Sequence, residues 1–260
     1  MRAITPRIFS AALLAVTVFC APAAARVNLL EPWHPGVDNT IPPPRTLTAQ
    51  AAILRGERLL EAPLSISYGV DIPLEAGARW GIRHVNDDTG ISDLMIGFKY
   101  VLLTSPVHAA TILFEGGAQL PTGDSSSGVG TGAVDFLLNW TLTKNLKTET
   151  GRDIDAYFGL GYTVTSENSD ELKRGNMFLY RLGAGWEYDR QVRLYGEIKG
   201  FNHAHTTYAG SRVDNSGFQE LYLAPGADLR LIPSLPLSAA ILFGLTPESH
   251  DVGLLISTAF

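Results

Sequence analysis

The feature that most constrains the fold of this chain is an alternation of apolar and polar side chains with a period of two residues. In residues 74–83, Leu74, Trp80 and Ile82 fall on one face of an extended chain, whereas Glu75 and Arg83 fall on the other. Successive side chains of a β-strand point to opposite faces, so this pattern predicts a strand. Similar segments recur from residue 46 to the end of the chain.

The alternating segments number about twelve, an even count of the kind that a closed single-chain barrel requires. Their polar faces are rich in glycine as well as charge, as expected for the crowded interior of a barrel. The predicted strands cover residues 46–54, 64–71, 74–83, 92–103, 110–120, 134–142, 154–164, 178–188, 192–201, 218–231, 237–245 and 252–260.

The connections between these segments sort by length. If both termini lie in the periplasm, short connections such as 71–73 and 189–191 lie on that side, and the longer pieces 121–129, 166–175 and 204–215 lie outside. Short periplasmic turns and long outer loops are typical of bacterial outer-membrane barrels. We therefore predict an all-β, transmembrane, antiparallel up-and-down barrel of about twelve strands, rather than a soluble β-sandwich.

The first 25 residues have the three parts of a secretory signal peptide. Arg2 and Arg7 supply a basic start, residues 11–19 a short apolar core, and residues 23–25 small side chains for cleavage. This core is too short to span a bilayer comfortably. We predict cleavage near Ala25 and a location in the bacterial outer membrane, with membrane lipid as a partner.

Cleavage at this position removes Cys20, the single cysteine, so the mature chain forms no disulfide. A lipoprotein is the alternative interpretation of Cys20, but the bulky Phe19 before it disfavours lipid modification. Removing Arg2 and Arg7 leaves 18 of the 20 basic residues against 26 acidic ones, a formal charge of −8. This charge, with no basic patch, argues against nucleic acid as a partner. No cofactor is indicated.

The mature chain divides into two parts. Residues 26–45 are rich in proline and cannot form a strand, because proline cannot donate to a β-ladder. We expect a periplasmic tail, with a plug in the lumen as the alternative. Residues 46–260 form the barrel. The chain ends on Phe260, which resembles the terminal aromatic signal that outer-membrane proteins present to the barrel assembly machinery, so Phe260→Ala should reduce assembly.

The inward face is where function is expected, because charge on the lipid face is costly. The alternation leaves two interpretations of this face open: a salt-bridge network that fills a narrow barrel, or a constricted polar channel or ligand cavity. Register across the turn at 189–191 predicts Glu187 opposite Arg193 and Arg181 beside Lys199. The candidate lumen residues are Glu75, Arg79, Arg83, Asp93, Lys99, Glu115, Asp135, Asp155, Arg181, Glu187, Arg193, Glu197, Lys199, Glu220, Asp228 and Arg230.

An enzyme is the least favoured class of function. None of the six histidines lies in a recognisable nucleophile motif. His203 and His205, with Asp214 and Ser216 beyond them, could form a metal site or a Ser/His pair, but loop histidines are more often solvated. We therefore predict no catalytic residue and no metal site.

Two segments resemble the barrel family named for the meta-pathway of phenol degradation. Residues 90–100, with Asp93, Gly97, Lys99 and Tyr100, are similar to that family's "G-x-G-D-L-x-x-G-x-K-Y" strand, although Ser92 stands where the family usually has glycine. Residues 120–124, Leu-Pro-Thr-Gly-Asp, followed by 130–132 and 135–136, resemble its next signature. The resemblance implies an outer-membrane protein that passes hydrophobic aromatic compounds.

These observations predict a passive channel or binding protein for small, in particular hydrophobic aromatic, molecules. A narrow salt-bridged barrel with a structural or stress role is the alternative, and an enzyme acting on lipid or peptide ranks third.

Overall fold

The structure, a computed structural model, describes residue 45 and residues 47–259 apart from 56–58, 71, 86, 148–152, 190, 233–234 and 250–251. The predicted signal peptide, most of the proline-rich segment and Phe260 lie outside the described residues. In the described part of the chain, no helix is long and apolar enough to cross a membrane.

Twelve antiparallel strands form a closed barrel, as the alternation predicts. The sheet closes because β1 pairs with β16 on one side and with β2 on the other, and β2 pairs with β3. The barrel strands are β1 (Leu47–Arg55), β2 (Leu59–Gly69), β3 (Leu74–Val85), β5 (Leu94–Ser105), β6 (Ala110–Leu120), β7 (Asp135–Lys147), β8 (Asp153–Val164), β10 (Met177–Glu187), β11 (Val192–His203), β14 (Phe218–Ile232), β15 (Leu235–Gly244) and β16 (Val252–Ala259).

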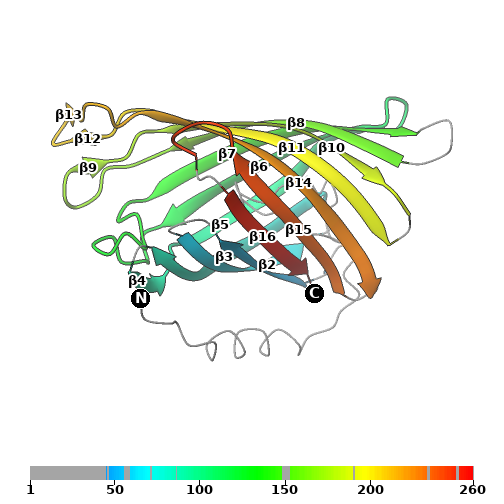
Figure 1. Cartoon of the computed structure of the whole chain (residues 1–260), viewed down its shortest axis with the longest axis horizontal. Helices are drawn as coiled ribbons and strands as arrows, with labels where there is room; N and C mark the ends of the chain where they lie inside the picture. The colour runs from blue at the N-terminus through cyan, green and yellow to red at the C-terminus, as the bar shows by residue number, and fades with distance from the viewer. Residues whose placement is uncertain are drawn as a thin grey trace.

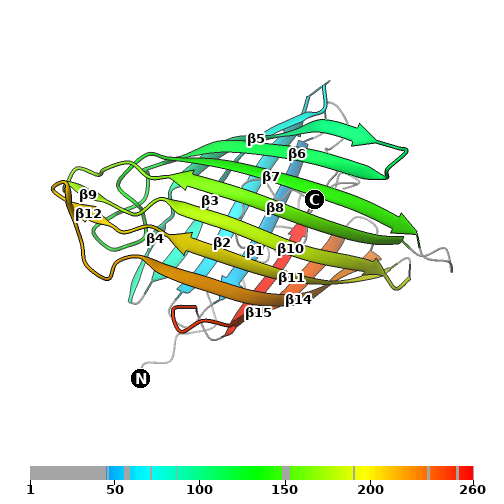
Figure 2. The same ribbon diagram turned by 90° about the horizontal axis from the view of Figure 1, so that it is seen from above.

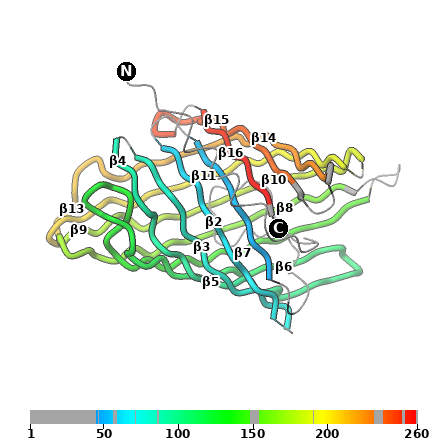
Figure 3. Tube along the Cα trace, turned by 90° about the horizontal axis from the view of Figure 1, so that it is seen from below, coloured from blue at the N-terminus to red at the C-terminus, as the bar shows by residue number. Residues whose placement is uncertain are grey.

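The two ends of the barrel differ. Four short strands, β4 (Asp88–Ile91), β9 (Leu172–Lys173), β12 (Thr207–Tyr208) and β13 (Ser211–Arg212), lie at one end, opposite the end at which β16 finishes (Figure 1). We call the former the loop end and the latter the turn end. Segments 121–134, 165–176 and 204–217 join strands at the loop end, and β9, β12 and β13 form a small separate sheet there. Strands β7 to β14 form one side of the barrel and β1 to β3 the other, which lies behind in Figure 2 and is seen from the opposite side in Figure 3.

Several strand boundaries differ from those predicted. Strand β2 begins at Leu59 rather than residue 64, because the ladder with β3 continues through Pro63, paired with Gly81. Strand β7 continues to Lys147, which pairs with Asp153, rather than ending at residue 142. The predicted loops 166–175 and 204–215 contain β9, β12 and β13.

Alternation separates the two faces of the wall. On β7, Leu138, Trp140 and Leu142 are exposed on the outside, whereas Leu137, Thr141 and Thr143 are buried inside. The outside is therefore a continuous apolar surface of the kind that contacts lipid, and polar side chains concentrate within.

Candidate functional site in the barrel lumen

Arg193 is the centre of a charged cluster near the turn end. It lies on β11 and forms an ion pair with Asp155 on β8, two strands away, and another with Asp228 on β14 at 2.9 Å. Ser238 donates a hydrogen bond of 2.6 Å to the second oxygen of Asp228. Four strands are thus joined through one guanidinium group, whose buried charge is compensated by two carboxylates.

A second cluster lies nearer the middle of the lumen. Lys199 pairs with Glu197 at 2.9 Å, and the Tyr157 hydroxyl donates to the other oxygen of Glu197 at 2.6 Å. All three side chains are almost fully buried. Arg181 lies 3.9 Å from Glu115 and donates to the Thr141 hydroxyl at 2.7 Å.

Two further groups extend this charged region along β2, β3 and β5. Lys99 lies 3.3 Å from Glu75, with both side chains at most 1% exposed. Arg79 and Arg83 both bind Glu61, each at 3.0 Å. We call all of these ion-paired residues the polar belt. Each charged side chain of the polar belt is paired with one of opposite sign, which offsets the cost of burying charge inside the barrel.

Glycine makes room for the polar belt. A Cβ atom at Gly185 would overlap the Arg193 guanidinium, and one at Gly183 would overlap the Tyr157 ring. Gly159 in the same way lies beneath Arg181, and Gly226 beneath Tyr195. Long side chains therefore lie flat across the neighbouring strand, in troughs that only glycine leaves open. This explains why glycine alternates with charge on the inward face.

An apolar surface occupies the loop half of the lumen. Its members are buried and come from six consecutive strands, β10, β11, β14, β15, β16 and β1. We call this surface the apolar wall; it comprises Ala52, Leu54, Leu179, Phe201, Tyr222, Ala224, Leu242 and Leu255. In the loop half of the lumen, apolar side chains therefore lie beside charged ones: Tyr222 and Ala224 stand opposite Lys199 and Glu197, and Leu54 stands opposite Glu61.

Polar side chains border the apolar wall at the loop end. Glu220 lies one inward position before Tyr222 on β14 and accepts a 3.2 Å hydrogen bond from its hydroxyl. His203 on β11 lies 3.4 Å from the other Glu220 oxygen and stacks on Phe218, with ring centroids 4.2 Å apart. Aromatic rings therefore surround this carboxylate.

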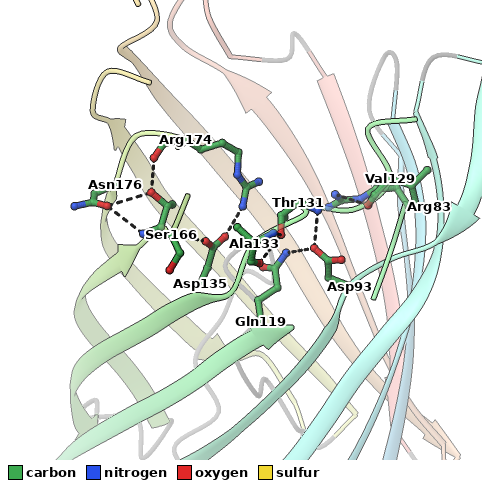
Figure 4. Close-up of polar contacts among 11 residues, drawn as sticks. Arg83, Asp93, Gln119, Val129, Thr131, Ala133, Asp135, Ser166, Arg174 and Asn176 are labelled. Atoms are coloured by element: carbon green, nitrogen blue, oxygen red, sulfur yellow. Dashed lines mark hydrogen bonds and ion pairs between the residues drawn. The ribbon is translucent and has the colours of Figure 1, made fainter. Parts of the chain in front are cut away.

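Asp93 fastens segment 121–134 at the loop end (Figure 4). It accepts hydrogen bonds from the backbone nitrogens of Gly123 and Thr131, both 2.8 Å, and from the Gln119 amide at 2.9 Å. The register with β3 shifts by one residue between β4 and β5, and such a bulge re-aims side chains. Ser92 and Asp93 lie at this bulge, and both are buried.

Segment 121–134 also contacts the barrel through Val129, which is buried against Gly90. The Val129 carbonyl accepts a 3.5 Å hydrogen bond from Arg83, the residue that also binds Glu61. Asp135, the first residue of β7, forms an ion pair with Arg174 and accepts from the Ser166 nitrogen at 3.1 Å (Figure 4). Two long connections are thus tied to the mouth of the barrel.

The candidate residues named from the sequence fall into three groups. Arg230 pairs with Glu187 at 3.4 Å, and both are partly exposed at the turn end. Asp93, Asp135 and Glu220 lie at the loop end, and the remaining candidates belong to the polar belt. Glu187 and Arg193 are opposite in register, as are Arg181 and Lys199. Arg193 nevertheless pairs with two aspartates and not with Glu187: Asp155, which it reaches across Gly185, and Asp228, which is opposite in register on β14.

Sequence reasoning missed several members of the site. Glu61 is not among the predicted lumen residues because the predicted strand begins at residue 64, after Pro63. In the structure, Glu61, Ser65 and Ser67 all lie on the inward face of β2. Tyr157 was missed because the pattern alone does not distinguish a buried tyrosine from a lipid-facing one. Arg174, in a loop, carries no periodic signal. Inward apolar residues such as Phe201 interrupt the alternation, so the pattern does not mark them as part of a site.

His203 and His205, which were weighed as a metal site or Ser/His pair and not favoured, contact different partners. His203 faces Glu220 and Phe218, whereas His205 contacts Arg212 and accepts from the Gly217 nitrogen at 3.2 Å. Ser216 donates to the Val213 carbonyl and accepts from the Thr206 nitrogen. Over the described residues, no group of three or more His, Cys, Asp or Glu is arranged to hold a metal ion.

The closed sheet, the apolar exterior and the packed charged interior define a β-barrel of the bacterial outer-membrane type. The chain belongs to the family described as "Putative MetA-pathway of phenol degradation", whose model matches residues 47–253. No curated protein matches the sequence.

Solved structures with the same fold are known. The COG4313 outer membrane channel from Pseudomonas putida F1 is 11% identical, with a TM-score of 0.68 over 84% of this chain and 95% of that one. The NanC porin and the KdgM porin are each 8% identical, with TM-scores of 0.54 and 0.53, over 82% of this chain and 98% of theirs. At these identities the likeness establishes the fold.

Proposed function

We propose that this protein is an outer-membrane channel that binds small apolar molecules, aromatic ones in particular, and lets them pass without an energy source. The observation that carries the proposal is the apolar wall, since a water-filled pore for sugars or ions needs a polar lining along its whole length. Burial of an aromatic ligand against such a wall is favourable by about 25 cal/mol per Å². The family's description supports the same class of molecule.

In this proposal the loop end faces the outside and the turn end faces the periplasm, after export with cleavage near Ala25. A solute meets segment 121–134 and the Glu220 region first, then the apolar wall with Glu61 and Lys199 of the polar belt beside it, and the cluster around Arg193 last. Because the charged side chains of the polar belt are engaged with one another, few of them can replace the water molecules around a passing ion. Ions should therefore pass slowly. In this proposal, the role of the sixteen candidate lumen residues is mainly structural: they hold the strands around the channel in place. The segment up to residue 45 is proposed as a periplasmic tail.

A structural barrel without transport is the second candidate. The observation that favours it is the polar belt itself, whose ion pairs join nonadjacent strands, as between Arg193 and Asp155 and between Arg181 and Glu115. An enzyme acting on lipid or peptide gains no support from His203 and His205, which face different partners.

Solute flux tests these alternatives. The purified protein is placed in vesicles with lipopolysaccharide in the outer leaflet, and entry of toluene, arabinose and potassium is compared with entry into protein-free vesicles. We expect toluene to enter faster through the protein, with little gain for the other two. Leu242→Asn, in the apolar wall, should reduce the gain for toluene. If the protein accelerates none of the three, the structural barrel is the better interpretation.

A further inference from the structure

Two of the long connections at the loop end form a single unit. Strand β9 of segment 165–176 pairs with β12 of segment 204–217, and β12 pairs with β13 of the same segment. The Ala209 nitrogen also donates a 2.9 Å hydrogen bond to the Glu171 carbonyl. Figure 1 shows this small sheet beyond the ends of β10, β11 and β14. We call the two segments together the outer flap.

The outer flap buries little of its own apolar surface. Leu172, Tyr208 and Val213 are all exposed, and each of the three strands of its sheet has only two residues. So small a sheet is marginally stable unless one face packs on the rest of the protein. Segments with few buried apolar contacts open at a low cost in free energy. The flap should therefore move without disturbing the barrel ladders.

Segment 121–134, which lies beside the flap, is fastened more firmly. Val129 is buried, and Asp93 accepts hydrogen bonds from two backbone nitrogens of the segment. A Cβ atom at Gly132 would lie 3.4 Å from the Cβ of Asn168, so the flap reaches this segment. Segment 121–134 is thus a fixed edge in contact with a loosely packed neighbour.

Asp135 joins the flap to this fixed edge. Arg174 of the flap forms an ion pair with one carboxylate oxygen, and the Ser166 nitrogen donates to the other at 3.1 Å (Figure 4). The Asp135 side chain is 2% exposed, whereas that of Arg174 is 47% exposed. The carboxylate is therefore built into the mouth of the barrel, and the arginine reaches it from the solvent side. Arg174 can leave this partner and be hydrated at little cost.

The flap has glycine at two of the points where it leaves the barrel. Gly175 lies two residues before β10, and Gly217 lies directly before β14. A Cβ atom at Gly175 would overlap the carbonyl of Ala204, the first residue after β11, so the two limbs of the flap leave side by side. Hinges in proteins are a few residues at the ends of elements that absorb a change in backbone dihedral angles, and glycine permits the widest change.

We propose that the outer flap is a gate at the loop end of the lumen. The Asp135–Arg174 ion pair is its latch, and segment 121–134 is the fixed edge against which it closes. This inference rests on the proposed function, since a gate presupposes a passage, and it adds control of entry by the salt concentration outside. Release of Arg174 lets the flap swing about the ends of β10, β11 and β14, while the barrel strands stay paired.

Hydrogen exchange measured by mass spectrometry tests the movement of the flap without any solute. In nanodiscs, Arg174→Gln should make the amides of 165–176 and 204–217 exchange about two- to fivefold faster, the factor expected for loss of a half-exposed ion pair. Segment 121–134 should keep its rate. Arg174→Lys should retain most of the protection, because it keeps the charge. Lys173→Gln is the matched control: it removes one positive charge from the neighbouring residue and should exchange like the natural protein.

Salt tests the latch in the natural sequence. Raising the salt concentration from about 0.1 M to about 1 M shortens the Debye length from about 10 Å to about 3 Å. This change should speed exchange of the flap in the natural protein and have little effect in Arg174→Gln, which has no latch to screen. Toluene entry into vesicles should rise in parallel, both with salt in the natural protein and on replacement of Arg174.

Folding of each variant is checked by its mobility in unheated gels, and the salt series on the natural protein holds if a variant does not fold. Flap exchange that ignores both salt and Arg174→Gln, or that rises equally in Lys173→Gln, overturns the proposal. So does faster flap exchange with unchanged toluene entry. If toluene enters through none of these proteins, the proposed function fails instead. The gate is then judged by potassium conductance, which Arg174→Gln should raise and Lys173→Gln should not.

Discussion

The backbone nitrogen of Thr131 donates a 2.8 Å hydrogen bond to the carboxylate of Asp93, a residue 38 positions earlier in the chain. The other carboxylate oxygen accepts from the Gly123 nitrogen, so one side chain holds both limbs of segment 121–134. The backbones of Gly123 and Gly130 also lie in contact, so closely that a Cβ atom on either residue would overlap the other. The shape of this segment thus depends on a carboxylate supplied by a different hairpin.

Replacing Asp93 should release segment 121–134 and leave the barrel intact. Asp93→Ala removes the acceptor of three hydrogen bonds, so we expect protease cleavage within 121–134 to become at least about tenfold faster, as a loss of roughly 1.4 kcal/mol would produce. Limited proteolysis followed by mass spectrometry measures the rate. Asp88→Ala, an exposed aspartate of the same hairpin, should cleave like the natural protein. Equal rates in both variants would show that Asp93 does not hold the segment.

Replacing Arg193 should destabilise the barrel strongly. Arg193→Met leaves Asp155 and Asp228 without their cation, and breaking a buried ion pair in this way costs about 3–5 kcal/mol. Urea unfolding in lipid vesicles measures the loss. Adding Asp155→Asn and Asp228→Asn should recover most of it, because no unpaired charge then remains.

Arg230→Met is the control for this experiment, since Arg230 is about half exposed and pairs with a partly exposed Glu187. Its loss should cost less than about 1 kcal/mol, as for other exposed ion pairs. Similar costs for the two arginine variants would contradict the distinction drawn between the polar belt and the turn end.

The glycine troughs predict a difference between two glycines on neighbouring strands. Gly183→Ala would force its Cβ into the Tyr157 ring, which is 2% exposed and has no room to move. We expect overpacking to cost about 1–3 kcal/mol. Gly196→Ala meets nothing within 4 Å and should be nearly neutral. The temperature at which each variant loses its folded band in gels gives the comparison, and equal shifts would refute the trough interpretation.

Segment 121–134 should also respond to acid at its tip. The Ser126 hydroxyl and backbone nitrogen both donate to Asp124, and these bonds lower the pKa of its carboxyl below the ordinary value of 3.8. A lowered pKa in the folded loop means that the bonds stabilise it above pH 3.8 and that this contribution is lost as the pH falls through the folded pKa.

Amide exchange of Ser126, corrected for intrinsic pH dependence, should therefore show protection at pH 6 that declines below pH 3.8. In Asp124→Asn the protection should not change over this range, because the amide does not titrate there. A decline of the same size in both proteins would place its cause elsewhere in the loop.

The barrel could be predicted from the sequence because each strand carries its own signal. A period of two determines the inward face of residues such as Glu75 and Lys99 without knowledge of any neighbour. Register across the short turn at 189–191 then follows, and the opposition of Glu187 and Arg193 agrees with it.

The contacts of the site were harder to predict, because register positions Cα atoms and not the ends of long side chains. Arg193 could not be assigned to Asp155 without knowing that Gly185 lies between them. The position of Asp93 depends on a one-residue bulge, which breaks the alternation used to find the strands. The apolar wall was missed because inward leucines such as Leu242 and Leu255 resemble lipid-facing ones in a single sequence.

The troughs beneath the long lumen side chains have a consequence for the history of the family. Gly185 and Arg193 occupy complementary volumes on adjacent strands, so neither can change freely while the other stays. A relative that has lost the arginine can tolerate a larger residue at position 185, whereas one that keeps it cannot. Substitutions at these paired positions should therefore be inherited together, and the pairs that vary jointly among relatives would reveal which side chains lie across which strands.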